Sequence, residues 1–295
     1  MTETQAQASP APMIPDVAPE EIGANVYVIP DHRIDLVPNV GIVVGEDAVL
    51  VVDTGMGLAN GRRVLERARE LAAGRPLLLT LTHFHPEHGF GAQAFEGEAV
   101  LVYNRVQKEE LDEKFAEFVE MFSGFAPAIA DILADVRLVV PRITYVDAAD
   151  IDLGGTTVQL RYFGPAHTRG DQVVFLPGPR ILFAGDLVEN RFFPILPDPD
   201  AHGSLWIDLL ERLDGLGPAV VVPGHGAVGG AGLIREVRDY LVDVRARVRG
   251  LREAGQDLDG IRSVLEPEIR GRYESCDNPM WIAFAIDNFH AELDG

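Results

Sequence analysis

Four apolar segments of this chain each end in an aspartate or a histidine, and they form two similar pairs. In the first half "VLVVD" ends in Asp53 and "LLLTLTHFH" ends in His85; in the second half "ILFAGD" ends in Asp186 and "AVVVPGH" ends in His225. Continuous apolar runs bounded by Gly and Pro are typical of strands buried on both faces. The pattern predicts an α/β domain of two similar halves, with polar side chains gathered at one edge of its sheets.

Helical patterns separate these strands and continue to the end of the chain. Apolar residues at helical spacing predict helices at residues 60–74, 105–135, 204–216, 230–253 and 278–293. We therefore divide the chain into three parts: a flexible tail at 1–23, a main domain at 24–250 and a helical extension at 251–295. The last helix suits packing on the domain or on a partner subunit, which leaves a homodimer open.

The balance of charge narrows the classes of partner. The sequence contains 25 Lys and Arg against 46 Asp and Glu, a formal net charge of −21. Binding to nucleic acids and to anionic membranes depends on Lys and Arg, so both partners are disfavoured and a small-molecule substrate is favoured. No apolar run approaches the roughly 20 residues that span a bilayer.

The number of cysteines and the first residues of the chain indicate a cellular compartment. Cys276 is the one cysteine, so no internal disulfide can form. This is typical of proteins in reducing compartments. The first residues lack the basic start and apolar stretch of a secretory signal. We expect a soluble, cytoplasmic protein.

The densest group of ligand-type side chains follows the apolar run "PLLLTLT". His83, His85, Glu87 and His88 lie within six residues, although the chain has only eight histidines. On extended backbone His83 and His85 point to the same face. Pro86 then turns the chain, and the adjacent Glu87 and His88 diverge. Imidazole and carboxylate are the usual ligands of Zn²⁺ and similar ions, so this segment can direct ligands at two neighbouring ions.

Three further candidate ligands follow strands elsewhere. His167 lies in "GPAHTRGD", Asp186 in "FAGD" and His225 in "VVPGHG", each beside Gly or Pro. Taken alone, each has a structural interpretation, since lone histidines are usually structural and Asp186 also suits a turn or a helix cap. Three histidines in one segment and two more after distant strands favour a metal site.

Together these motifs resemble those of the metallo-β-lactamase fold superfamily. "HFHPEH" is similar to the His-x-His-x-Asp-His signature of that family, and "VVDTG", "GPAHTRGD", "FAGD" and "PGHG" fall in its order and approximate spacing. The similarity covers residues of about 24 to 250. It implies an α/β (α+β) fold, a four-layer αββα sandwich of two similar halves, with a one- or two-metal site at one edge of the sheets.

The resemblance also implies a role for each residue. The first metal would be held by three imidazoles, those of His83, His85 and His167. The second would be held by Glu87, His88 and His225. Asp186 would bridge the two ions, and Asp53 would lie beneath the site as an acceptor that fixes the orientation of a ligand. The alternative for Asp53 is a cap on the helix after "TGMG".

Glu87 departs from the family pattern, which usually has Asp at this position. Glu is one methylene longer, so the second metal could shift, bind more weakly or be absent. The alternative is that Glu87 only favours the dipole of a helix that starts there. We expect two zinc ions per chain when metal is abundant, the second more labile; iron and manganese suit the same donors.

Other residues near the motifs have open roles. His32 lies in a loop that can pass near the site in this fold, and Arg169 suits either an anionic substrate or the surface. The Pro-rich segment 187–206, which includes Trp206, can wall a pocket or pack against the final helices.

The expected chemistry is hydrolysis. Water bound to such ions has a pKa near 7, and the resulting hydroxide can attack a carbonyl that the ions polarise. Asp186, Glu87 and Asp53 are the expected catalytic residues besides the histidine ligands, and Asp186 could also hold a proton. Because Asp186 replaces the cysteine of many β-lactamases, the chain resembles the glyoxalase-II-like and lactonase-like branch. An ester, thioester or lactone is the expected substrate.

Three alternatives stay open at this point. The first is β-lactam hydrolysis, as a main or a promiscuous activity. The second is oxidation of a thiol or persulfide at a single iron. The third is a homologue that binds metal without turnover.

Overall fold

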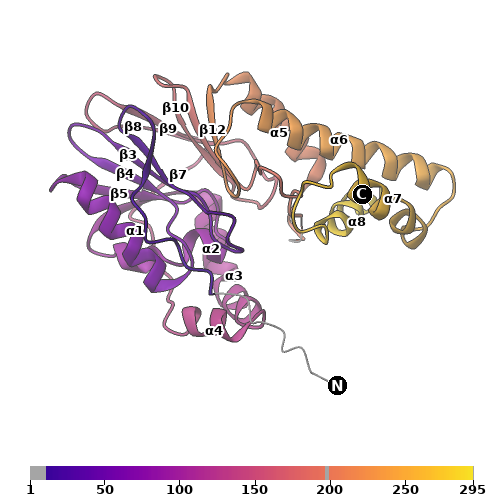
Figure 1. Ribbon diagram of the computed structural model, residues 1–295, viewed down its shortest axis with the longest axis horizontal. Helices are drawn as coiled ribbons and strands as arrows, with labels where there is room; N and C mark the ends of the chain where they lie inside the picture. Colours follow the sequence, from indigo (N-terminus) through magenta and orange to yellow (C-terminus); the bar gives the residue numbers. More distant parts are fainter. Residues whose placement is uncertain (1–10, 197–198, 295) are drawn as a thin grey trace.

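Two β-sheets lie face to face between two layers of helices, as Figure 1 shows. The computed structural model describes residues 11–196 and 199–294. The helices of the N-terminal half cover one sheet and those of the C-terminal half cover the other. The predicted four-layer αββα sandwich is therefore confirmed.

The first sheet has seven strands in sequence order. They are β1 (Glu20–Gly23), β2 (Val26–Ile29), β3 (Val40–Val44), β4 (Val49–Val52), β5 (Leu77–Thr80), β6 (Ala99–Asn104) and β7 (Ile143–Tyr145). Pairing is antiparallel from β1 to β4 and parallel from β4 to β7. The helices of this half are α1 (Gly57–Ala72), α2 (Pro86–Gly89), α3 (Arg105–Ser123) and α4 (Pro127–Leu133), with a 3₁₀ turn at Ala92–Phe95.

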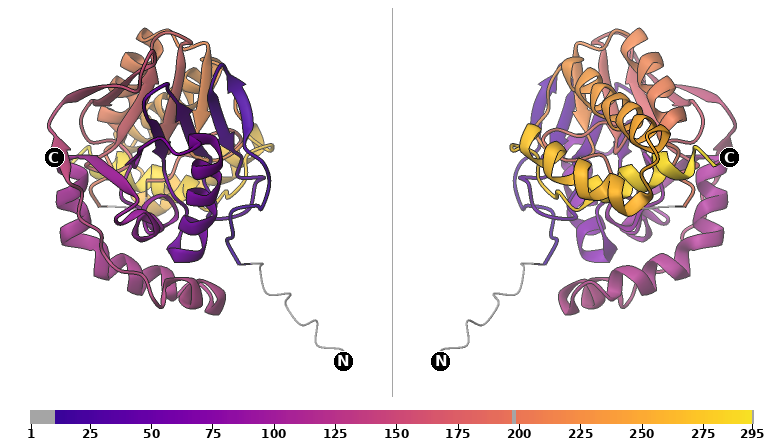
Figure 2. Two further views of the ribbon diagram at one scale, coloured as in Figure 1. Left: turned by 90° about the vertical axis from the view of Figure 1, so that its left-hand side faces the viewer. Right: turned by 90° about the vertical axis from the view of Figure 1, so that its right-hand side faces the viewer.

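The second sheet has five strands in the order β12-β11-β10-β9-β8. They are β8 (Ala148–Asp152), β9 (Thr157–Tyr162), β10 (Gln172–Leu176), β11 (Ile181–Gly185) and β12 (Val220–Pro223). The helices of this half are α5 (Gly203–Gly215), α6 (Gly232–Glu253), α7 (Leu258–Arg272) and α8 (Trp281–Ala291). In the right-hand view of Figure 2, α6 is the long orange helix that crosses the front of the molecule.

The two halves share one construction. In each, a parallel strand pair is joined by a helix: β4, α1 and β5 in the first, and β11, α5 and β12 in the second. The carboxyl ends of parallel strands meet at one edge of a sheet, which is where α/β folds place their ligand sites. Asp53 and Asp186 directly follow such ends.

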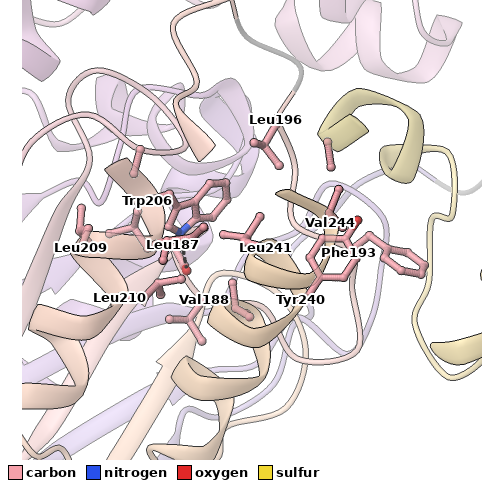
Figure 3. Packing of buried hydrophobic residues seen from close by; sticks show 14 of the residues in the cluster. Leu187, Val188, Phe193, Leu196, Trp206, Leu209, Leu210, Tyr240, Leu241 and Val244 are labelled. Atoms are coloured by element: carbon pink, nitrogen blue, oxygen red, sulfur yellow. Dashed lines mark hydrogen bonds between the residues drawn. The ribbon is translucent and has the colours of Figure 1, made fainter. Parts of the chain in front are cut away.

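Three apolar clusters hold the layers together. One lies between the sheets and includes Leu50, Val174 and Phe183, all buried. The other two lie between each sheet and its helices. In the second of these, Trp206 of α5 is fully buried near Leu241 of α6, as Figure 3 shows.

The prediction of a flexible tail is wrong for residues 11–23. Ile14 is buried, and its N–H donates to the side chain of Asn60 on α1. Asn60 in turn donates to the carbonyl of Pro12, and Glu20–Gly23 forms the edge strand β1. Because this apolar side chain and these backbone groups find partners, the composition of the segment does not leave it unpacked. Residues 1–10 lie outside the described residues.

The C-terminal helices pack on the second half of the sandwich. The predicted boundary at 250 falls inside a helix, because α6 continues to Glu253. Buried residues of α7 and α8, such as Ile261 and Ile286, belong to the same apolar cluster as those of α5 and α6. No helix among the described residues has the length and apolar character needed to cross a membrane.

Candidate metal centre

The segment after β5 changes direction at Pro86, as predicted. Thr80 ends the strand, and His83 and His85 follow on a buried loop. Pro86 is the first residue of α2, the position where its missing N–H costs nothing. This short helix turns Glu87 and His88 to a different side of the site. All four candidate ligands of the segment are buried.

The first group of side chains consists of three imidazoles. His83, His85 and His167 each present a ligand atom, and these atoms lie within 4.8 Å of one another. Nδ1 of His85 is 3.0 Å from Nε2 of His167. The lone pairs of two facing imidazoles repel unless a proton or a cation lies between them.

The second group adds two carboxylates and two imidazoles. Its ligand atoms also lie within 4.8 Å of one another, and they come from Glu87, His88, Asp186 and His225. Oδ1 of Asp186 is 3.0 Å from Nε2 of His88. Oδ2 of Asp186 is 3.9 Å from Nε2 of His83 and 3.7 Å from Nε2 of His167. Asp186 thus lies between the two groups.

These spacings fit shared cations. Two donors bound tetrahedrally to zinc at about 2.1 Å are separated by about 3.4 Å, close to the separations at Asp186. Several buried atoms here also form no hydrogen bond with the described residues: Nε2 of His83 and His88, Oε2 of Glu87 and both oxygens of Asp186. Buried polar atoms are normally satisfied, so this set is a cradle for cations.

Hydrogen bonds fix the ring orientations. An imidazole nitrogen can donate to a carbonyl or a carboxylate only when it carries a proton. Nδ1 of His167 lies 2.7 Å from the carbonyl oxygen of Ile195, and Nδ1 of His225 lies 2.9 Å from that of Val37. Each Nδ1 therefore carries the proton, and the lone pair of the ring is on Nε2, the atom directed at the other candidate ligands.

Asp53 holds His88 in the same way. Its Oδ2 lies 2.9 Å from Nδ1 of His88 and accepts a hydrogen bond from the hydroxyl of Thr82 at 2.8 Å. Its Oδ1 accepts the backbone N–H of Thr82. The helix-cap alternative fails, because α1 begins after Met56 and has no side-chain cap. Asp53 has φ +67°, a strained conformation that the two bonds to Thr82 hold in place.

The electrostatics suit neutral ligands in the first group. Burial lowers the pKa of His83 and of His85 well below the ordinary histidine value, so both rings are neutral at pH 7. Burial also favours neutral His88, but Asp186 and Asp53 outweigh it and hold the pKa of His88 well above the ordinary value. A cation that binds His88 therefore displaces a proton.

Glu87 and Asp186 respond differently to burial. Burial raises the pKa of Glu87 to about 7. Burial also acts to raise the pKa of Asp186, but the imidazoles of His88, His225 and His83 hold it well below the ordinary value. The position between the two groups is thus occupied by a carboxylate.

Sequence reasoning missed the residues that support the ligand loops. Asp31 accepts the backbone N–H of Gly226, and Asn39 donates to the carbonyls of Pro223 and Gly226. Glu189 accepts the backbone N–H of His225. Asp31 and Asn39 lie in the loop before β3, and Glu189 lies in the Pro-rich loop after β11, and only their polar character in such loops could have drawn attention to them.

Asp171 supports the other ligand loop. Its carboxylate accepts the backbone N–H and the hydroxyl of Thr168, directly after His167. Asp171 closes the quoted motif "GPAHTRGD", so the sequence did contain this signal.

The structure gives a different environment to each residue whose role the sequence left open. His32 is exposed. Arg169 forms ion pairs with Glu113 and with Asp200. Trp206 packs in the core, where its indole N–H donates to the carbonyl of Leu187 and its ring lies 5.8 Å from that of His167. In the segment 187–206, residues 197–198 lie outside the described residues.

The sequence is similar to several characterised proteins. It is 25% identical over 225 residues to a linear primary-alkylsulfatase of Pseudomonas sp., covering 65% of this chain and 42% of the relative. It is 32% identical over 114 residues to a type 2 metallo-beta-lactamase of Bacteroides fragilis, covering 38% of this chain and 46% of the relative. The chain thus spans less than half the length of these two relatives. The human acyl-coenzyme A thioesterase MBLAC2 is 28% identical over 69% of this chain and 78% of its own length.

Solved structures and a family model agree on the fold. The metallo-beta-lactamase from Pontibacter korlensis superposes with a TM-score of 0.61 at 20% identity, covering 76% of this chain and 97% of its own. The sec-alkylsulfatase Pisa1 from Pseudomonas sp. reaches 0.72 at 15% identity, covering 93% of this chain and 50% of its own. The sequence model of the metallo-beta-lactamase superfamily matches residues 33–225. The chain therefore belongs to the metallo-beta-lactamase superfamily, and the predicted superfamily is confirmed, while the glyoxalase-II-like and lactonase-like branch stays a prediction.

Proposed function

We propose that this hydrolase binds two zinc ions and cleaves a carboxylic ester, thioester or lactone. The observation that supports it most is the pair of buried donor groups that share Asp186 between them. His83, His85 and His167 would hold one ion, and Glu87, His88 and His225 the other. The ions would supply a nucleophilic water of lowered pKa and a Lewis acid for the carbonyl oxygen.

The residues of the chain would then position and transfer protons. Asp53, Ile195 and Val37 fix the rings of His88, His167 and His225, so that these ligands do not reorient during turnover. Asp186 would remain ionised at neutral pH, because the bound cations would favour its carboxylate over the neutral acid. In that state it can accept a proton and return it to the leaving group.

The choice of bond rests on the site and on the relatives. Asp186 occupies the position between the two groups, and Cys276 lies outside both. The thioesterase likeness supports an acyl substrate. A cytoplasmic location is part of this proposal, supported by the single cysteine.

The test combines metal content with a substrate panel. We expect the zinc-loaded protein to hydrolyse an aryl ester, a thioester or a lactone faster than it hydrolyses a chromogenic β-lactam, an alkyl sulfate or a phosphodiester. His85→Ala should reduce that hydrolysis at least a thousandfold and lower the zinc content measured by elemental analysis. Normal turnover in His85→Ala would refute the site. A preference for one of the other three bonds would refute the substrate class.

A further inference from the structure

A cavity of about 300 Å³ opens directly beside the metal centre. His85, Glu87 and His167 form one end of it. A molecule that fills the cavity therefore reaches the side chains at which we place the chemistry. Apart from Ile195, whose carbonyl holds the His167 ring, the hydrolytic roles assigned above do not use its other walls. These walls come from Leu36, from α3 and its end, from Pro199 and Asp200, and from Trp281.

One wall is an aromatic and apolar face of α3. Met121 and Phe122 lie three and four residues after Phe118, and Phe125 lies three residues after Phe122, so the four side chains lie along one side of this helix and its end. The ring of Phe118 stacks on His85 with 5.3 Å between centroids. The centroid of the Phe122 ring lies 6.1 Å from that of Phe118 and 4.8 Å from that of Phe125. The wall thus runs continuously from a candidate ligand to the surface.

The C-terminal helix contributes Trp281 to the same cavity. At the outer end, Met121 is 42% exposed and Phe125 is 58% exposed. Apolar side chains left open at the mouth of a pocket gain free energy when an apolar ligand covers them. The extension at the end of the chain therefore helps to form the candidate active site.

The charges in the cavity disfavour an anionic ligand there. Among the described residues, Lys114 is the one Lys or Arg that lines it, and its Nζ lies 2.8 Å from Oδ2 of Asp200 and 3.3 Å from Oε1 of Glu110. Glu117 and Asp200 also line the cavity. Because carboxylates outnumber cations, an anionic group placed far from the metal centre meets like charge. An uncharged aliphatic chain is not repelled by these carboxylates.

We propose, on the basis of the proposed function, that this cavity binds the unbranched aliphatic acyl chain of the substrate. A methylene group occupies about as much space as a water molecule, roughly 30 Å³. A cavity of about 300 Å³ therefore holds a chain of about ten carbons. The scissile carbonyl lies at the end formed by His85 and His167, and the chain runs outward along Phe118, Phe122 and Phe125.

A series of 4-nitrophenyl esters tests the chain length. With the zinc-loaded full chain, kcat/KM should rise about threefold to fourfold for each added methylene, up to about ten carbons, and then level off. The rise should come mainly from KM, because the chain is bound equally in the ground state and the transition state. A profile that is flat or that falls with length would overturn the proposal.

A matched pair of variants tests the location. Met121 and Met280 are both exposed, but only Met121 lines the cavity. Met121→Glu places a carboxylate in the path of the chain, and we expect the decanoyl-to-acetyl ratio of kcat/KM to fall at least tenfold. In Met280→Glu the ratio should stay within twofold of the original. Equal ratios in the two variants would place the chain elsewhere.

Binding without turnover separates this proposal from the proposed function. Decan-1-ol should change the tryptophan fluorescence of the zinc-loaded protein saturably, and Trp281→Phe should remove most of the change, since Trp206 is fully buried in the core. If no ester is hydrolysed but decan-1-ol binds at Trp281, the proposed function fails and the aliphatic pocket stands. If esters are hydrolysed but decan-1-ol does not bind, the pocket fails alone.

Discussion

At the scale of single residues, Asp53 shows how the fold prepares a candidate ligand. It touches His88 and Thr82, not the space where the candidate ligand atoms meet. Its carboxylate selects the ring tautomer of His88 that leaves Nε2 directed at Asp186. The sequence predicted this role from the end of a strand and from the family resemblance, and the contact with His88 is present in the structure.

Asp53→Asn tests that role. The amide can no longer accept as strongly from Nδ1 of His88, so we expect the second zinc to bind 10- to 100-fold more weakly and the first to change much less. Competition with a zinc chelator measures both affinities. Asp131→Asn, on the exposed side of α4, is the control. Equal weakening of both ions would show that Asp53 supports the fold rather than one ligand.

Residue patterns predicted which candidate ligands come together but not everything around them. The spacing of His83 and His85, the turn at Pro86 and the strand ends at Asp186 and His225 all carry local signals. The metal binding of these residues stays a prediction. The aromatic face of α3 could not be distinguished from core packing, because Phe118 and Phe122 have the same periodicity that any buried helix has.

At the scale of elements, α1 packs closely against the start of the 3₁₀ turn that follows α2. A Cβ on Gly61 of α1 would lie 2.1 Å from the carbonyl oxygen of Gly91, just after α2. Backbone cannot move aside as a flexible side chain can. The position of Glu87 and His88 therefore depends on this glycine.

Gly61→Ala tests the contact. We expect it to lower the free energy of unfolding by about 1–3 kcal/mol, measured by urea denaturation, and to weaken the second zinc. Gly250→Ala is the matched control, since Gly250 lies in α6 with nothing near its Cβ position. That variant should be more stable by about 0.5–1 kcal/mol. A stable Gly61→Ala protein with unchanged zinc affinity would contradict the account.

The sequence predicted the apolar strands better than the polar edge strands β1 and β8. Continuous apolar runs located β4, β5, β11 and β12. Strand β8 has the polar sequence "AADID", and β1 has "EEIG". Edge strands of this kind carry charges that protect the sheet from unwanted pairing, so apolar patterns do not reveal them.

At the scale of the whole molecule, the candidate metal centre draws its residues from both halves of the sandwich. His83, His85, Glu87 and His88 come from the first half, and His167, Asp186 and His225 come from the second. A cation bound to both halves stabilises the folded chain and not the unfolded one. The fold therefore predicts that stability depends on metal.

Removal of the metal tests this coupling. With zinc about a thousandfold above its dissociation constant, binding adds about 4 kcal/mol. Chelation should then lower Tm by roughly 10 °C, and added zinc should restore it. Differential scanning calorimetry at fixed pH measures the change. The Tm of His85→Ala should respond to zinc far less.

The central claim is that seven buried side chains hold two ions. The most direct test is the number of zinc ions bound per chain, measured by elemental analysis after equilibrium dialysis of the metal-free protein against zinc. The account predicts two, one released before the other as the free zinc concentration falls. A protein that retains no zinc in stoichiometric amount, although it is folded by circular dichroism, would contradict it.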